Sequence, residues 1–541
     1  MQSTPPAADR APLVREWPWL LGVVLGWAFL LHPGFSRFGY PTGADWDTYL
    51  ASAAHLWLDP VTHHYNEWRL PLYPWLVGLF GTLGSYVRAG QALALASTLA
   101  LLLGTGLLAR ALAGRWAGAL AALAAAFMPL VVEGSFWVSP YPLVAGAVAL
   151  ALGFGAACAR WPRWGWALAA GACGGFALAM DTRALPVACA LPLLAALGPG
   201  PGRRRLGLAL LALGPLLAWE GADFALRAGY DLRLRSFRSQ LAIQHDDQPG
   251  VGAPPPPEGF VAASRCEKQW GLKDPTPFGP CAGLRRAGNF GMLRSRLFLP
   301  PFGVLLCGLL FSLLPPAWGR RGSLASALVF WPTAASVAVG TSLVLYPSRY
   351  LLPVAPLLAA LTPVALARLT GLPGLRWPAA RRLAWFGAAL AAAWLAFGWP
   401  SLRPAALLQP HQVFWRQKGT QGSDWSQDGH EALRQWALHD LGPDANLVDC
   451  AGLRLAMAVL PRVLPVVDAP PHHQTCLDWI LHPEPATGTT WLLTLHQCDF
   501  GTDPRLLGPD QVARAGWVEV PLAAADGAAL EAQGIKRWRS P

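Results

Sequence analysis

Several charged side chains of this sequence lie in short polar stretches between long apolar runs. Asp45, Asp47 and Tyr49 share one stretch, and Glu67 and Arg69 share the next. A carboxylate can take a proton from an attacking hydroxyl, and the planar fork of a guanidinium can hold two phosphate oxygens. These residue types therefore suit proton transfer and the binding of a charged ligand, provided that the fold brings the stretches together.

Each of these residues also has a purely structural interpretation. Asp45 stands where a helix can begin and can cap it, and Tyr49 then shares its face four residues later. Asp47 would in that case face solvent. Glu67 and Arg69 precede an apolar segment, and charges at a lipid boundary are costly unless they pair or bind a ligand. The chemical and the structural interpretations both stay open at this point.

The elements that must position these residues are membrane helices. Of the 541 residues, 53% are hydrophobic and only 13% are charged, against roughly 25% charged in soluble proteins. A spanning helix needs about 20 apolar residues, and about 11 such segments follow one another here. This excludes a single soluble domain. We expect spans near residues 17–31, 89–110, 116–133, 141–159, 164–180, 184–199, 206–222, 297–316, 323–345, 349–370 and 383–399.

The arginines set the expected topology. A cytoplasmic N-terminus places every arginine-rich short loop on the cytoplasmic side, and the basic excess is confined to residues 1–399, which argues against nucleic-acid binding. The apolar segment 72–83 is short for a span, so we expect it in the outer membrane boundary or as a re-entrant segment. Loops 32–88 and 223–296 and the tail 400–541 then face outward.

The expected fold class is mainly α, a polytopic membrane protein with a C-terminal soluble α/β domain. The membrane domain covers residues 1–399 and the outer domain residues 400–541. In the tail, helical patterns alternate with apolar strands such as 446–448, 463–467 and 491–495, which predicts a small α/β domain with a largely parallel sheet.

The expected topology strengthens the assignment of Arg183 and Arg349 as functional residues. They are the basic residues of the two shortest outer turns, 181–183 and 346–349, on the side that the charge rule leaves without arginine. Binding of an anionic ligand would explain both. The alternative is that each side chain extends along the membrane surface without a ligand.

The cysteines fit the same map. Cys266 and Cys281 share the long outer loop and are candidates for a disulfide in an oxidising compartment. One pair among the three tail cysteines is a second candidate. Cysteines within the spans are expected to be inert packing residues. The sequence contains no Cys/His spacing typical of zinc, and His245-Asp246-Asp247 alone cannot complete a metal site, so no metal is predicted.

The order of five motifs resembles that of the GT-C membrane glycosyltransferases, with protein O-mannosyltransferases and aminoarabinose transferases as closer relatives. The resemblance covers about residues 17–400. It rests on Asp45…Tyr49, Arg69-Leu-Pro-Leu-Tyr-Pro, Pro140-Tyr-Pro142, Asp181-Thr-Arg183-Ala-Leu-Pro186 and Arg349-Tyr-Leu-Leu-Pro353.

The resemblance implies roles for individual residues. Asp45 matches the acidic residue of the first loop, the general base of the family. Arg69, Arg183 and Arg349 match basic positions that face the carrier phosphate, although Leu70 stands where many relatives have a proline. Tyr141 replaces an acidic residue that several relatives carry, so Glu67, Asp47 or Glu133 would have to supply any second carboxylate. Tyr49, Asp47, Glu67 and Tyr141 are expected to line the pocket.

The implied activity is transfer of a hexosyl or pentosyl group from a polyprenyl-phosphate donor to an acceptor hydroxyl, with inversion. We expect it at the periplasmic face of the bacterial inner membrane. The lipid-linked sugar, the bilayer and an envelope acceptor would be the partners, without nucleic acid, and a divalent metal cofactor has no support in the sequence. The alternatives are a transporter or flippase of lipid-linked sugars, which would show inverted repeats, and a non-enzymatic envelope assembly protein.

Overall fold

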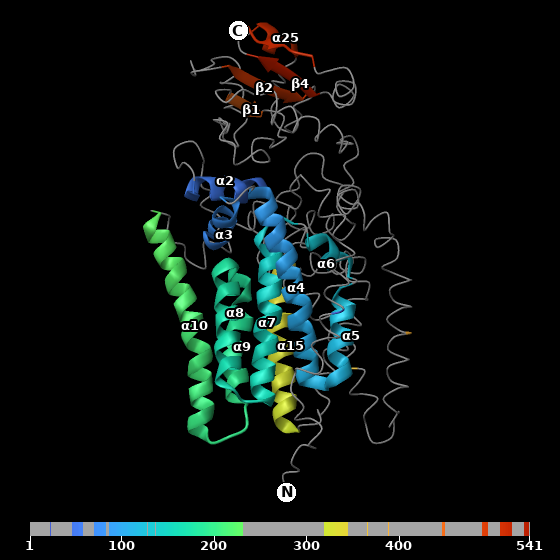
Figure 1. Ribbon diagram of the computed structural model, residues 1–541, viewed down its shortest axis with the longest axis vertical. Coiled ribbons are helices and arrows are strands. Elements are labelled where there is room, and N and C mark those ends of the chain that lie inside the picture. The colour runs from blue at the N-terminus through green and yellow to red at the C-terminus, as the bar shows by residue number, and fades with distance from the viewer. Residues whose placement is uncertain are drawn as a thin grey trace, which may run out of the picture.

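The computed structural model describes residues 46–57, 70–82, 86–126, 128–135, 137–230, 319–343, 446–449, 489–495, 509–514, 516–521 and 535–539, with single positions 22, 365 and 388. A helical bundle makes up most of this structure, and a small sheet lies beyond one of its ends (Figure 1). The helices are α2 (Trp46–Trp57), α3 (Leu72–Gly81), α4 (Tyr86–Ala113), α5 (Arg115–Ala126), α6 (Pro129–Gly134), α7 (Pro140–Arg160), α8 (Trp164–Met180), η3 (Thr182–Ala184), α9 (Leu185–Ala196), α10 (Gly202–Gly229) and α15 (Arg320–Leu343).

Three of the described helices, α4, α7 and α10, are long and apolar enough to cross a membrane. A helix of 28 residues, the length of α4 and α10, rises about 42 Å, more than the hydrocarbon core of about 30 Å. Shorter apolar helices, among them α3, α8 and α9 with η3, pack against these long helices. The mainly helical, apolar character that the sequence predicts is confirmed.

The central helices approach one another closely through glycines. A Cβ atom at Gly104 of α4 would lie 2.4 Å from the carbonyl carbon of Ala149 in α7, and one at Gly146 of α7 would lie 2.4 Å from the Ser97 oxygen of α4. The same holds between α8 and α10, where Gly171 faces Ala212. Small residues at such crossings allow backbone-to-backbone packing within a membrane. The bundle is therefore held at a spacing that a larger side chain would disrupt.

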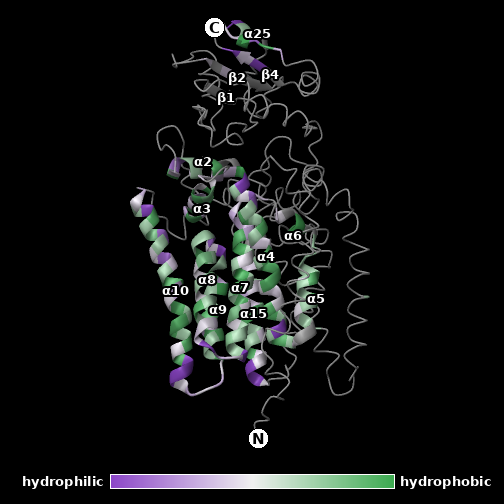
Figure 2. Ribbon diagram, viewed as in Figure 1, coloured by the Kyte–Doolittle hydropathy of each residue, from purple (hydrophilic) through white to green (hydrophobic). Residues whose placement is uncertain are grey.

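Arginines collect at the end of the bundle where α10 and α15 begin, and Figure 2 shows hydrophilic residues there. Arg160, the last residue of α7, donates from Nη1 to the carbonyls of Arg110 and Ala111 at 3.1 and 3.0 Å. Arg205 donates to the carbonyl of Ala196, the last residue of α9, at 2.7 Å. Basic side chains thus satisfy carbonyls that helix C-termini leave open, which ties neighbouring helices together at this end.

Helices α2 and α3 lie across the opposite end of the bundle (Figure 1). Gly78 of α3 leaves room for the Trp57 ring, which a Cβ atom there would meet at 2.0 Å. The Trp57 indole donates to the Trp75 carbonyl at 2.9 Å. With 10 residues, α3 is about 15 Å long, too short to span a bilayer. Its placement at the outer membrane boundary remains a prediction.

Two expected spans differ from the observed helices by more than about three residues at an end or by an interruption. The span 116–133 is interrupted between α5 and α6, because Pro129 carries no backbone N–H and disfavours helical geometry at Met128. The span 206–222 is part of the longer α10, whose last two turns contain an ion pair between Asp223 and Arg227 at 2.7 Å. The expected spans 17–31, 297–316, 349–370 and 383–399 lie outside the described residues apart from single positions.

The described strands of the tail form a four-stranded sheet in the order β1-β2-β4-β3. They are β1 (Asn446–Asp449), β2 (Thr490–Leu495), β3 (Val518–Glu519) and β4 (Ile535–Arg539). The expected strands 446–448 and 491–495 are confirmed as β1 and β2, which pair in parallel. However, β4 pairs antiparallel with both β2 and β3. The expectation of a largely parallel sheet is therefore wrong for the described strands, because the chain after β2 returns to it in the opposite direction.

The division into domains at residue 400 stays a prediction.

Within the described helices, Cys158, Cys173 and Cys189 are free thiols, and Cys158 is buried. Cys266 and Cys281 lie outside the described residues, so their disulfide also stays a prediction.

Candidate active site

The turn between α8 and α9 carries the candidate site. Helix α8 ends at Met180, and Asp181 both terminates it and begins the single turn η3. The Asp181 side chain accepts a hydrogen bond from the backbone N–H of Arg183 at 2.9 Å. Asp is a preferred residue at such turn starts because its carboxylate satisfies an open N–H. The sequence Asp-Thr-Arg thus fixes the backbone on which Arg183 stands.

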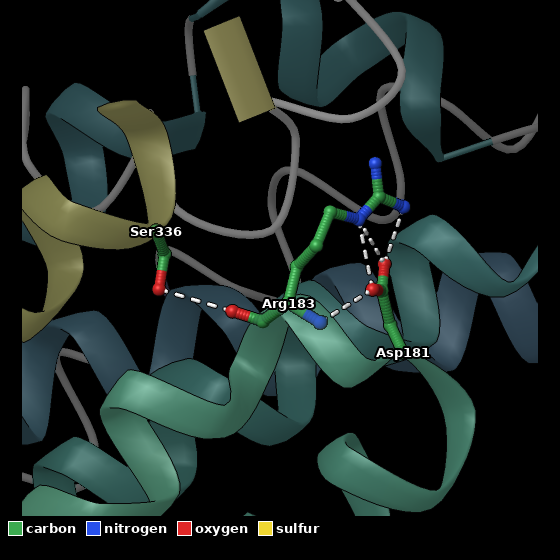
Figure 3. Close-up of polar contacts among 3 residues, drawn as sticks. All are labelled: Asp181, Arg183 and Ser336. Carbon is green, nitrogen blue, oxygen red and sulfur yellow. Dashed lines mark hydrogen bonds and ion pairs between the residues drawn. The ribbon is translucent and has the colours of Figure 1, made fainter. Parts of the chain in front are cut away.

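The Arg183 guanidinium forms a two-pronged ion pair with Asp181 (Figure 3). Nε donates to Oδ1 at 2.8 Å and to Oδ2 at 3.1 Å, and Nη2 donates to Oδ2. The side chains are only 11% and 7% exposed. Charge-assisted bidentate contacts are the strongest hydrogen bonds in proteins and fix orientation as well as distance. The pairing also lowers the cost of burying either charge.

Tyr141 lies beside this pair, although 42 positions separate it from Arg183 in the sequence. The guanidinium carbon of Arg183 lies 5.5 Å from the centre of the Tyr141 ring, within the range of a cation–π contact. Tyr141 is buried in the first turn of α7, where Pro140 starts the helix. Two residues that the sequence analysis assigns to the pocket, from separate motifs, are therefore brought together.

A third element reaches the site from far along the chain. Ser336 of α15 donates from Oγ to the backbone carbonyl of Arg183 at 3.1 Å (Figure 3). Arg183 is thus contacted through its side chain by Asp181 and Tyr141, and through its backbone by Ser336.

Tyr49 lies in a buried cluster between α2, α3 and α4. Its ring meets that of Tyr73 edge-on, with centroids 5.2 Å apart, and Tyr86 and Val138 belong to the same cluster. Burial raises the pKa of Tyr73, so its hydroxyl stays protonated and neutral. Tyr49 is itself only 3% exposed. The contacts described for it are those of a packing residue, and its role in lining a pocket stays a prediction.

The other predicted site residues lie wholly or in part outside the described residues. Helix α2 begins at Trp46, directly after Asp45, and contains Asp47, but the Asp45 residue and the Asp47 side chain lie outside the described part of the structure. Glu67, Arg69 and Arg349 also lie outside it. The convergence of Asp45, Arg69 and Arg349 with Arg183 therefore stays a prediction. Among the described residues, no three His, Cys, Asp or Glu side chains gather into a possible metal site.

Sequence reasoning missed two contributors to this site. Asp181 was part of the Asp181-Thr-Arg183 motif but received no role, although an acidic residue two positions before an arginine in a short turn signals a local ion pair. Ser336 has no comparable signal. It lies 153 positions from Arg183, and a serine within an apolar helix is not distinguished by its neighbours.

The chain shares the fold of ArnT, an aminoarabinose transferase of the GT-C superfamily of membrane glycosyltransferases. The apo structure of ArnT from Cupriavidus metallidurans matches with a TM-score of 0.52 and 15% identity, over 96% of this chain and 97% of ArnT. The structure of the same ArnT bound to undecaprenyl phosphate matches with a TM-score of 0.50 and 15% identity, over 97% of this chain and 98% of ArnT.

A weaker match, with a TM-score of 0.42 and 15% identity, is the Archaeoglobus fulgidus oligosaccharyltransferase in the apo form. It covers 79% of this chain and 59% of that one. No protein-family model and no curated protein sequence matches the chain. The resemblance that the five motifs indicate is confirmed at the level of the fold.

Proposed function

We propose that this protein transfers a sugar from a polyprenyl-phosphate-linked donor to an acceptor hydroxyl, with inversion, at the periplasmic face of the bacterial inner membrane. The observation that carries the proposal is the nearly buried, ion-paired arginine of the α8–α9 turn. Asp181 holds Arg183 over Tyr141 within a fold shared with ArnT.

The fold supports a lipid-phosphate ligand. ArnT from Cupriavidus metallidurans has been solved with undecaprenyl phosphate bound, so a bundle of this architecture can accommodate a polyprenyl phosphate. In the reaction, the donor's phosphate would leave as the lipid phosphate, and the acceptor would take its place on the sugar.

The geometry of Arg183 suits the leaving phosphate. Negative charge on the phosphate grows as its bond to the sugar breaks, and a cation already fixed in position stabilises that charge without reorganising. Asp181 and Tyr141 provide this fixation through a bidentate contact and the ring face. A guanidinium has five N–H donors in a rigid fork, which allows it to hold Asp181 and a phosphate together.

Asp45 is the proposed general base. It would take the proton from the acceptor hydroxyl as the acceptor oxygen forms a bond to the anomeric carbon. The bond from that carbon to the phosphate oxygen breaks in the same step, and its electrons leave with the polyprenyl phosphate. Arg69 and Arg349 would share the phosphate with Arg183, and Asp47, Glu67, Tyr49 and Tyr141 would line the pocket.

The distribution of charge supports the proposed orientation. The arginines of α10 and α15 gather at the end of the bundle opposite α2 (Figure 2), and arginine-rich short loops are typical of the cytoplasmic side. Asp181 and Arg183 follow α8, which starts at the arginine-rich end and runs away from it. The candidate site would therefore open to the periplasm.

The test is a comparison of lipid-linked sugars and envelope glycans by mass spectrometry in cells with the wild-type protein, without it, and with Arg183→Ala. We expect Arg183→Ala to lose the glycan product and accumulate the lipid-linked donor, as the deletion does. Arg203→Ala, which changes an exposed arginine at the far end of the bundle, should behave as wild type. A full product level with Arg183→Ala at normal abundance would overturn the role of Arg183.

A further inference from the structure

Ser336 joins α15 to the turn that carries Arg183. Its Oγ lies 3.1 Å from the carbonyl oxygen of Pro332, one turn earlier in the same helix, and 3.1 Å from the carbonyl oxygen of Arg183. The side chain is 4% exposed. The buried hydroxyl thus links its own helix to a second element. Both acceptors are backbone carbonyl oxygens, so the helix and the turn fix their positions.

Two other hydroxyl residues of α15 provide a comparison. Ser326 and Thr333 are also buried, and each donates to the carbonyl four residues earlier, at 2.7 and 2.6 Å. This back-bonding satisfies a hydroxyl within an apolar helix. Ser336 has one proton, which it shares between the Pro332 carbonyl of its own helix and the Arg183 carbonyl of the α8–α9 turn, both 3.1 Å from its Oγ. Local satisfaction of the hydroxyl therefore does not explain its second contact.

The Arg183 carbonyl lies where the helical hydrogen-bond pattern is interrupted by sequence. The residue three positions later is Pro186, which has no N–H to donate. The turn η3 is only three residues long and is followed directly by α9. A donor from α15 at this carbonyl restrains the peptide unit from which the long Arg183 side chain extends (Figure 3).

We propose that Ser336 is a positioning residue, which acts through Arg183 to hold the guanidinium in register with the donor phosphate. This inference rests on the proposed function. Asp181 fixes the guanidinium and Ser336 fixes the backbone beneath it, so α15 becomes part of the anion site without touching the ligand. Small displacements of a positioned group can cost large factors in binding or rate, and one neutral hydrogen bond corresponds to about a five- to tenfold effect.

The experiment measures binding of undecaprenyl phosphate and of undecaprenol, its uncharged alcohol, to the full chain in nanodiscs. We expect Ser336→Ala to weaken binding of the phosphate about five- to tenfold and to leave binding of the alcohol unchanged. Ser336→Thr keeps the hydroxyl and should restore phosphate binding. Thr333→Val, which removes a hydroxyl from the same helix, should match wild type with both lipids.

A second comparison tests whether Ser336 affects phosphate binding through Arg183. In an Arg183→Ala background, Ser336→Ala should change phosphate binding less than twofold, because the guanidinium that it positions is gone. An equal loss in both backgrounds, or equal losses for phosphate and alcohol, would overturn the inference in favour of general packing. If Ser336→Ala does not fold, Ser336→Cys, whose thiol is a weaker donor, should show an intermediate loss for the phosphate alone, and wild-type binding by it would likewise overturn the inference.

The outcomes separate this inference from the proposed function. If wild type does not prefer the phosphate over the alcohol, or if Arg183→Ala binds both as wild type does, the proposed function fails. If Arg183→Ala loses the phosphate and Ser336→Ala does not, only the positioning role of Ser336 fails.

Discussion

The ion pair of Asp181 and Arg183 makes a quantitative prediction about stability. The Asp181 carboxylate accepts hydrogen bonds from the backbone N–H, Nε and Nη2 of Arg183, and both side chains are nearly buried. Removing one partner of such a pair leaves a buried charge without compensation, which costs about 3–5 kcal/mol. We therefore expect Asp181→Ala and Arg183→Ala each to lower the free energy of unfolding by about this amount.

The double variant distinguishes a coupled pair from two independent contacts. Removing both charges leaves no buried ion, so its loss should be smaller than that of either single variant, about 1–3 kcal/mol for the remaining packing and backbone hydrogen bond. The assay is unfolding of the purified protein in detergent, without donor lipid, with Arg203→Ala as the exposed control. A double variant that loses as much as the sum of the two single variants would refute the reasoning.

Two further predictions concern the bundle. Gly146→Ala should destabilise the protein, because the added Cβ atom meets a carbonyl oxygen of α4 at 2.4 Å. Gly214→Ala, whose Cβ atom would lie in open space, should be neutral or slightly stabilising. Thermal unfolding of the two variants checks this, and equal unfolding temperatures would contradict it. Arg160→Ala should lower the free energy of unfolding by about 1–2 kcal/mol, because two hydrogen bonds to α4 carbonyls are lost. Arg163→Ala, at an exposed position, should leave the free energy of unfolding unchanged. Unfolding measurements decide, and no loss with Arg160→Ala would show that these bonds contribute nothing.

The helices were predictable because apolar length is a strong signal. The expected span 164–180 coincides with α8 in the structure, and 141–159 differs from α7 by one residue at each end. The end of α10 was missed because hydropathy treats Asp223 and Arg227 as the start of a loop. Their i, i+4 spacing lets them neutralise each other and continue the helix. Hydropathy alone does not contain such pairwise information.

The candidate site was predictable only in part. The residue types and the turn of Arg183 could be identified from sequence, because an arginine in a short turn predicted to face outward departs from the charge distribution of such loops. The contact with Tyr141 depends on how α7 and α8 cross, and the contact with Ser336 depends on where α15 packs. Both are tertiary relations between distant segments, which local patterns do not encode. The antiparallel β4 was missed for the same reason, since pairing depends on the return path of the chain.

The most direct measurement of the central claim is the activity of Asp45→Asn. The substitution removes the proposed base and keeps the size of the side chain. Mass spectrometry of lipid-linked sugars and envelope glycans should show loss of the product and accumulation of the lipid-linked donor, while the amount of protein in the membrane stays at the wild-type level. A wild-type product level in cells whose only copy is Asp45→Asn would contradict the account.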